Sequence, residues 1–285
     1  MNRYFLLFIC ISLSGCGGGR SVNKSEVVWN AENYSSDALQ AYTNDEWALA
    51  KKLFSRALIL YQSIDEQSGV LTSHINLVEV ALSSHDYQLA KSHLNWLNKS
   101  ETEQKQRVLL LNAIMALQQK KIAKAIVLIQ PLLPQDDDLN NINGIQLAAV
   151  ANRAKLAFIQ KKDEVVWTQR YADALNKTDH QTDSEGLLLR FQARLSSSVD
   201  DYEQAENKLQ QVLLIYKNSQ SRQGIAITLF DMAELCEKQK QWQCALAYLD
   251  RSIAVFKYLK NTEKVKQIES MASRIKMKLT KMEHN

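Results

Sequence analysis

Apolar and small residues recur along this chain at spacings of three and four, the period of an amphipathic helix. In residues 45–57 the recurring positions are Trp47, Ala50, Phe54 and Ala57. Four later stretches repeat this outline: Tyr87, Ala90, Leu94, Leu97; Ile122, Ala125, Ile129, Leu132; Tyr202, Ala205, Leu209, Val212; and Trp242, Ala245, Leu249, Ser252. The pattern predicts a protein built from repeated helices.

A second small or apolar residue precedes each of these alanines by twelve positions. The pairs are Ala38 and Ala50, Val78 and Ala90, Ala113 and Ala125, Ala193 and Ala205, and Ala233 and Ala245. Twelve residues let a helix end, turn and return to the same height, and small side chains let two helix backbones approach closely. Each copy is therefore predicted to be an antiparallel helix pair.

The gap between Ala125 and Ala205 is twice the gap between Ala205 and Ala245, so it leaves room for one more copy. A degenerate outline fits there: Val165, Thr168, Ala172 and Leu175, with Leu156 twelve residues before Thr168. We therefore expect six helix pairs. Beyond them, residues 259–285 place Val265, Ile268, Ala272, Ile275 and Leu279 on one side of a helix and many lysines on the other. We interpret this helix as a cap with a polar outer face, with a basic membrane-surface helix as the alternative.

Residues 34–258 resemble the tetratricopeptide repeat family, whose helix-turn-helix units are about 34 residues long. The best copy runs from Arg222 and Gly224 through Ala233 to Trp242 and Ala245, and it is similar to a longer variant of roughly 40 residues. The resemblance implies an all-α fold, a right-handed solenoid whose first helices line a concave groove. The positions that contact ligands in this family correspond here to Ile75, Glu79, Leu110, Ile114, Arg153, Arg190, Arg194, Phe230 and Glu234.

Arg190 and Arg194 are four residues apart, so they share one helical face. Together they could grip a carboxylate or an acidic peptide, with Arg153 adding to them. The alternative is an ordinary solvated pair of charges.

The first 15 residues have the form of a signal peptide: Arg3 followed by an apolar run that is too short to span a bilayer as a stable helix. The stretch Leu13-Ser14-Gly15-Cys16 resembles the lipobox of bacterial lipoproteins. That resemblance implies cleavage before Cys16, lipid on its sulfur, and transport to the periplasmic face of the outer membrane. Residues 16–33 then form a flexible linker. A plain secretory signal and a short membrane anchor are the alternatives.

Composition narrows the class of protein further. The 285 residues include only 2 Pro and 8 Gly, so nearly the whole chain can be helical. The net charge is +4, and removing residues 1–15 leaves 34 basic against 31 acidic residues, a balance that argues against nucleic-acid binding.

In the interruption at residues 131–144, Asp136, Asp138 and Asn140 alternate as calcium ligands do. However, Asn141 replaces the required Gly and no acid closes the loop, so we predict no metal site.

Of the four cysteines, Cys10 leaves with the signal peptide and Cys16 carries the lipid. Cys236 and Cys244 lie at nearly equal heights of one predicted hairpin, and an oxidising periplasm favours disulfides. Two hypotheses stay open: a Cys236–Cys244 disulfide, or two separately buried thiols.

No known catalytic motif is present: the sequence lacks His-Glu-x-x-His, Gly-x-Ser-x-Gly, a Gly-rich phosphate loop and Cys-x-x-Cys. His74 and His93 are interpreted as packing or surface residues. We therefore expect neither an enzyme nor a cofactor. The expected function is a lipid-anchored scaffold that binds protein or peptide partners in its groove. A peptide- or ligand-sensing regulator and a docking factor or activator for an envelope enzyme are the alternatives.

Overall fold

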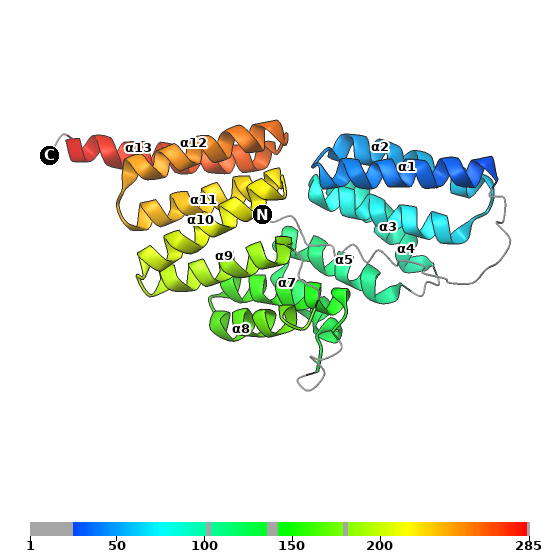
Figure 1. Cartoon of the computed structure of the whole chain (residues 1–285), viewed down its shortest axis with the longest axis horizontal. Helices are drawn as coiled ribbons and strands as arrows, with labels where there is room; N and C mark the ends of the chain where they lie inside the picture. The colour runs from blue at the N-terminus through cyan, green and yellow to red at the C-terminus, as the bar shows by residue number, and fades with distance from the viewer. Residues whose placement is uncertain (1–24, 101–103, 136–141, 179–181, 284–285) are drawn as a thin grey trace. The chain divides into compact units, whose positions relative to one another are not determined.

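The computed structural model describes residues 25–100, 104–135, 142–178 and 182–283. Within these ranges the chain is all-α, with thirteen α-helices, one short 3-10 helix and no strand (Figure 1). The predicted fold class is therefore confirmed, as is the expected number of helices: six pairs followed by one more helix.

The helices follow one another with short connections and pack against their neighbours in chain order. Their bounds are α1 Glu26–Thr43, α2 Trp47–Ser63, α3 Gln67–Ser83, α4 Tyr87–Lys99, α5 Lys105–Gln118, α6 Ile122–Ile129, η1 Gln130–Leu132, α7 Gly144–Gln160, α8 Glu164–Leu175, α9 Thr182–Ser198, α10 Tyr202–Asn218, α11 Arg222–Lys238, α12 Trp242–Tyr258 and α13 Thr262–Glu283. In Figure 1 the pairs α1–α2 and α11–α12 each lie side by side.

The chain divides into two compact units within α7. Of the described residues, those up to Gln135 and those from Asn143 to Leu156 form the N-terminal unit, and Ile142 with those from Ala157 onward form the C-terminal unit. Successive helices α1 to α6 pack together in the first unit, and α8 to α13 do so in the second. Each unit is thus a stack of helix hairpins, which buries a continuous core that no single hairpin could form.

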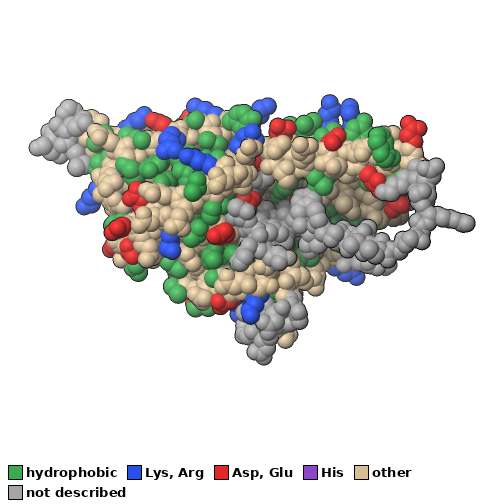
Figure 2. All heavy atoms as spheres, viewed as in Figure 1, with side chains coloured by type: hydrophobic (Ala, Val, Ile, Leu, Met, Phe, Trp, Pro, Cys, Tyr) green, Lys and Arg blue, Asp and Glu red, His purple; other side chains and the backbone are tan. Residues whose placement is uncertain are grey.

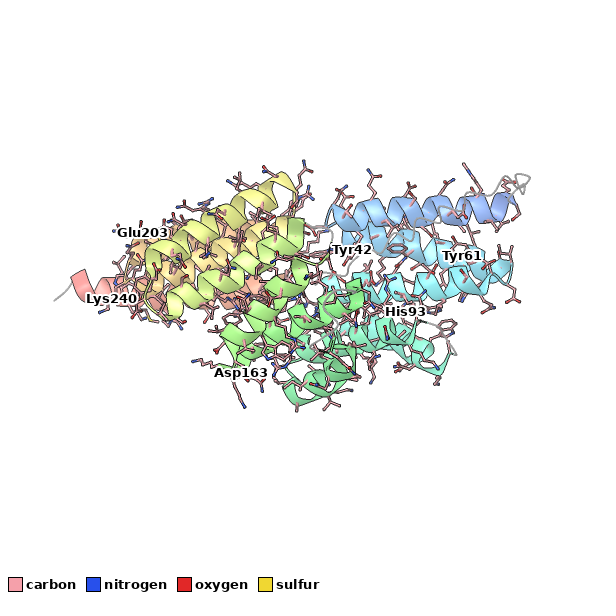
Figure 3. All side chains as sticks on the ribbon, turned by 60° about the horizontal axis from the view of Figure 1, so that its bottom comes forward. Tyr42, Tyr61, His93, Asp163, Glu203 and Lys240 are labelled. Atoms are coloured by element: carbon pink, nitrogen blue, oxygen red, sulfur yellow. A yellow bond between two sulfur atoms is a disulfide. The ribbon has the colours of Figure 1, made fainter. Side chains whose placement is uncertain are left out.

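One turn geometry reverses the chain at most connections. A residue with positive φ lies between the two helices, and the amide three positions after the last helical residue donates back to a carbonyl five residues earlier. Examples are Glu46 N to Ala41 O at 2.8 Å and Gln241 N to Cys236 O at 2.9 Å. These are Schellman-type helix ends. The positive-φ residues are Asp45, Asp65, His85, Lys120, Lys161, Asp163, Asp200, Gln220, Lys240 and Lys260, and Lys240 is labelled in Figure 3.

The small residues of the repeat form the centre of each hairpin. Ala50, Ala90, Ala125, Ala205 and Ala245 have no exposed surface. Their partners twelve residues earlier are buried too: Ala38, Val78, Ala113, Ala193 and Ala233. In the degenerate copy the predicted outline is wrong at two positions, because Ala172 is only half-buried and Val165 is exposed. Val165 is 67% exposed, and the fully buried Tyr171 fills the core instead, because α8 presents a different face.

One predicted boundary needs correction. The linker expected over residues 16–33 ends early, because α1 begins at Glu26. Ser25 caps this helix by accepting a hydrogen bond from the amide of Val28 at 3.3 Å, and Ala31 is fully buried, so this segment belongs to the first hairpin. At the other end, α13 begins at Thr262 and packs on α12 as the expected cap. No helix among the described residues is both long and apolar enough to cross a membrane.

A glycine near the start of α11 permits a close approach between neighbouring helices. The ring of Tyr216 on α10 covers Gly224, and a Cβ atom at that position would lie 2.5 Å from the ring Cγ. Tyr61 covers Gly69 of α3 in the same way. The absence of a side chain at these glycines therefore lets an aromatic residue of one hairpin seal against the next.

Candidate binding groove in the C-terminal unit

A groove of about 650 Å³ opens among α7, α9, α10 and α11. Its apolar part comes from three residues of the repeat outline, Ala193, Ala205 and Leu209, together with Leu235 on α11 and Phe158 near the end of α7. Small side chains at Ala193 and Ala205 leave this space open, since longer ones would fill it. We call this set of surfaces the C-terminal groove. Hydrophobic, basic and acidic side chains intermingle on the face of the C-terminal unit that Figure 2 shows.

A buried ion network joins α9 to α11 beneath the groove. Asp231 of α11 is 6% exposed and accepts a hydrogen bond from Arg190 Nε at 2.6 Å. Arg194 Nη2 donates to the other carboxylate oxygen at 3.1 Å. Burial by itself would raise the pKa of Asp231, but the two guanidinium groups outweigh it and lower that pKa. The network therefore holds Asp231 ionised and locks the two first helices together.

Glu234 lies one turn after Asp231 and lines the groove. Within the described part of the chain its carboxylate makes no hydrogen bond and no ion pair. Desolvation by the groove walls, followed by repulsion from Asp231, raises the pKa of Glu234. Attraction by Arg194, Arg190 and Lys238 offsets part of this rise.

Two other charged side chains of the groove bond to neighbouring helices. Lys238 Nζ donates to Ser197 at the end of α9, at 2.9 Å to its hydroxyl and 3.2 Å to its carbonyl. Glu237 accepts from Arg274 at 3.0 Å and from Lys278 at 3.0 Å, both on the cap helix α13. These bonds fix the rim of the groove.

Similar polar bonds link the first helices of the N-terminal unit. Arg107 of α5 donates to Glu79 of α3 at 2.6 Å. Burial raises the pKa of Glu79 despite the attraction of Arg107. The hydroxyl of Tyr42, labelled in Figure 3, shares a 2.9 Å hydrogen bond with Ser83 Oγ. In both units, polar side chains on successive first helices therefore meet each other.

This arrangement corrects much of the predicted ligand surface. Five of the proposed contact residues are buried in the protein and cannot touch a ligand: Ile75, Glu79, Leu110, Ile114 and Arg190. The physical reason is that successive first helices pack closely enough to turn these positions into helix-to-helix contacts. Arg153 and Phe230 are half-buried, whereas Arg194 and Glu234 do line the groove.

The idea that Arg190 and Arg194 grip a partner's carboxylate is also wrong in part, because the carboxylate they bind is Asp231 of the same chain. Asp231 was not among the predicted site residues. A signal was present: an acidic residue stands between the apolar Phe230 and Met232 of α11, 41 residues after Arg190 and so one repeat further on.

A second polar cluster lies between α3 and α4. The rings of His74 and Trp96 stack with centroids 3.9 Å apart, and His74 Nδ1 lies 2.8 Å from His93 Nδ1. Burial, followed by the charge of His93, lowers the pKa of His74 to about 4. Both rings are therefore neutral near pH 7, with one donating a hydrogen bond to the other.

The structure places a disulfide between Cys236 and Cys244, with their Cα atoms 5.9 Å apart. The bond joins the end of α11 to the start of α12 across the turn at Lys240. It lies next to groove residues, because Leu235 and Glu237 flank Cys236.

Several predicted features fall outside the described residues: Cys16 with its lipobox, and the alternating Asp136, Asp138 and Asn140. The described part of the chain contains no group of three or more His, Cys, Asp or Glu side chains arranged to hold a metal ion. No protein-family model matches this chain, and no curated protein matches it significantly.

Proposed function

We propose that this protein is a non-enzymatic scaffold that binds an extended segment of a partner protein in the C-terminal groove. The observation that carries the proposal is the groove itself: about 650 Å³ with an apolar floor and a rim of fixed charges. Ligand sites have this size and this mixture of apolar walls with a few polar groups. The resemblance to tetratricopeptide repeats points to the same mode of binding.

The groove is also rigid, which favours recognition. The Asp231 network, the Lys238–Ser197 bonds and the disulfide hold the ends of α9, α11 and α12 in place before any ligand arrives. A preformed site loses less conformational entropy on binding than a flexible one.

The proposed location rests on the resemblance of residues 13–16 to a lipobox. Lipid on Cys16 would tether the scaffold to the periplasmic face of the outer membrane, since each buried CH₂ of an acyl chain contributes about 0.8 kcal/mol. The substitution Cys16→Ser tests this part. We expect the variant to leave the membrane fraction on alkaline extraction, and its retention there would refute the anchoring.

Site-specific photocrosslinking in cells tests the scaffold. A photoreactive amino acid replaces Ser198 in the groove, and a matched control replaces Leu214, which is 60% exposed on α10 and does not line the groove. We expect discrete protein adducts, identified by mass spectrometry, from position 198 and not from position 214. Equal adducts from both positions, or none from position 198, would contradict the proposal.

A further inference from the structure

Two imidazole rings of the N-terminal unit meet nitrogen to nitrogen. His74 of α3 and His93 of α4, the latter labelled in Figure 3, are 19 residues apart in the chain, and their Nδ1 atoms lie 2.8 Å apart. They meet because α3 packs against α4, so no short sequence motif marks them. The pair belongs to a different unit from the C-terminal groove, and the proposed function does not use it.

Packing by itself does not explain this pair of rings. His74 is only 6% exposed, and its other ring nitrogen, Nε2, is buried without a hydrogen-bond partner among the described residues. A buried polar atom without a partner destabilises the fold, whereas two apolar side chains of similar shape would fill the same space without that cost. The two imidazoles therefore suit a purely structural contact poorly.

Both rings are in the protonation state that binds a metal ion. Burial, followed by the charge of His93, lowers the pKa of His74 to about 4, and burial, followed by the charge of Lys51 on α2, lowers the pKa of His93. Neutral imidazole is the form that coordinates metals, so at pH 7 no imidazolium has to lose a proton first. Lys51 is itself paired with Asp86 at 3.2 Å, which offsets part of its repulsion of a bound cation.

The distance between the two nitrogens selects the kind of metal ion. Two nitrogens bonded to one ion at about 2.0–2.1 Å are about 2.8–3.0 Å apart when they meet at a right angle, and about 3.3–3.4 Å apart in a tetrahedral site. The 2.8 Å between His74 Nδ1 and His93 Nδ1 matches the right angle. Right angles are typical of the square-planar and tetragonal sites of Cu²⁺ and Ni²⁺, whereas Zn²⁺ prefers a tetrahedron.

From this geometry we propose that His74 and His93 bind one Cu²⁺ ion through their Nδ1 atoms, with water in the remaining positions. Copper is chosen over nickel because nitrogen sites bind Cu²⁺ more tightly. The stacked ring of Trp96 holds His74 in place, while His93 is half-buried beside the exposed Ser92 and Asn95. His93 can therefore turn towards the ion, and water can reach it. The ring that donated the hydrogen bond moves its proton from Nδ1 to Nε2, so no net proton is released.

Titration of the full-length, chelator-treated protein with Cu²⁺ tests the site. Trp96, whose ring centroid lies 3.9 Å from that of His74, is the reporter, because a paramagnetic ion held beside an indole quenches its fluorescence. His93→Gln removes one ligand. The matched control is His85→Asn, which removes a histidine that contacts Tyr87 instead of the pair. Circular dichroism checks the fold of each variant, and electron paramagnetic resonance counts the imidazole nitrogens on the bound ion.

We expect saturable quenching by one Cu²⁺ per chain and a resonance spectrum of two imidazole nitrogens. His93→Gln should weaken the affinity at least about tenfold, whereas His85→Asn should leave it unchanged. Trp96→Phe should abolish the quenching but keep the spectrum, and Ni²⁺ should bind more weakly than Cu²⁺.

The proposal is overturned if no Cu²⁺ binds, if the bound ion has fewer than two imidazole nitrogens, or if the affinity survives His93→Gln. Tighter binding of Zn²⁺ than of Cu²⁺ would also overturn it. The resonance spectrum of the unsubstituted protein decides the matter even if His93→Gln does not fold.

Discussion

Removal of the Asp231 carboxylate is the sharpest test of how this protein is held together. In Asp231→Ala, Arg190 loses its 2.6 Å acceptor while its side chain remains only 5% exposed. Removing one partner of a buried ion pair leaves the other charge uncompensated, which costs about 3–5 kcal/mol. We expect a loss of this size in the free energy of unfolding of the C-terminal unit.

Hydrogen exchange of the amides of α9 and α11 is a suitable assay, because it reports on the C-terminal unit by itself. The exposed Asp250→Ala on α12 is the control and should change stability by less than about 0.5 kcal/mol. The double variant Asp231→Leu with Arg190→Met removes both charges and should recover most of the loss. A cost below about 1 kcal/mol for Asp231→Ala, or no recovery in the double variant, would refute the assignment of the network as the link between these helices.

The same network predicts a dependence on pH. The folded pKa of Asp231 lies below its ordinary value of 3.8, so the unfolded chain binds the proton more readily. The stability that Asp231 contributes is therefore fully present above pH 3.8 and is lost as the pH falls through the lower folded value. The slope of stability against pH in this acidic range should be smaller in Asp231→Asn.

Three other predictions concern separate parts of the fold. Gly224→Ala places a Cβ atom 2.5 Å from the ring of Tyr216 and should lower the free energy of unfolding by about 1–3 kcal/mol, with Tyr216→Leu suppressing part of the loss in a double-mutant cycle. Lys240→Gly should raise the free energy of unfolding by about 0.5–1 kcal/mol. Positive φ costs a residue with a side chain roughly 1–2 kcal/mol, and the greater backbone entropy that glycine loses on folding offsets part of the gain. A fall in melting temperature would contradict this prediction. The pKa of His74 is about 4 in the folded protein against 6.5 for the free side chain, so the stability that neutral His74 contributes is full above pH 6.5 and is lost as the pH falls towards 4. His74→Phe should therefore flatten the curve of stability against pH in this window. An unchanged curve would exclude His74 as the source of the pH dependence.

The sequence predicted the helix pairs and the cap correctly, because each depends on one residue type that recurs at a fixed spacing for one structural reason. Alanines such as Ala50 and Ala245 recur where two helix backbones cross, and they are fully buried. The apolar stripe after Thr262 predicted the cap, and four of its five residues are buried: Val265, Ile268, Ala272 and Ile275. The sequence was misleading at residues 26–33, where the polar context concealed a helix that Ser25 caps.

Side chains from different repeats could not be assigned in this way. Arg190 and Asp231 are 41 residues apart, and the sequence around each one alone predicts an exposed charged side chain. Only when α9 packs beside α11 do they meet, exclude water and stop being available to a partner.

The sequence by itself determined that the chain is a series of helix hairpins, because helical periodicity and small residues at the crossing points are local properties with a fixed spacing. Only the tertiary structure decided which charged side chains pair inside the protein and which line the groove, because ion pairing depends on distances between helices that are far apart in the chain. Thus Arg190 became part of the core, and Glu234 was left facing the groove.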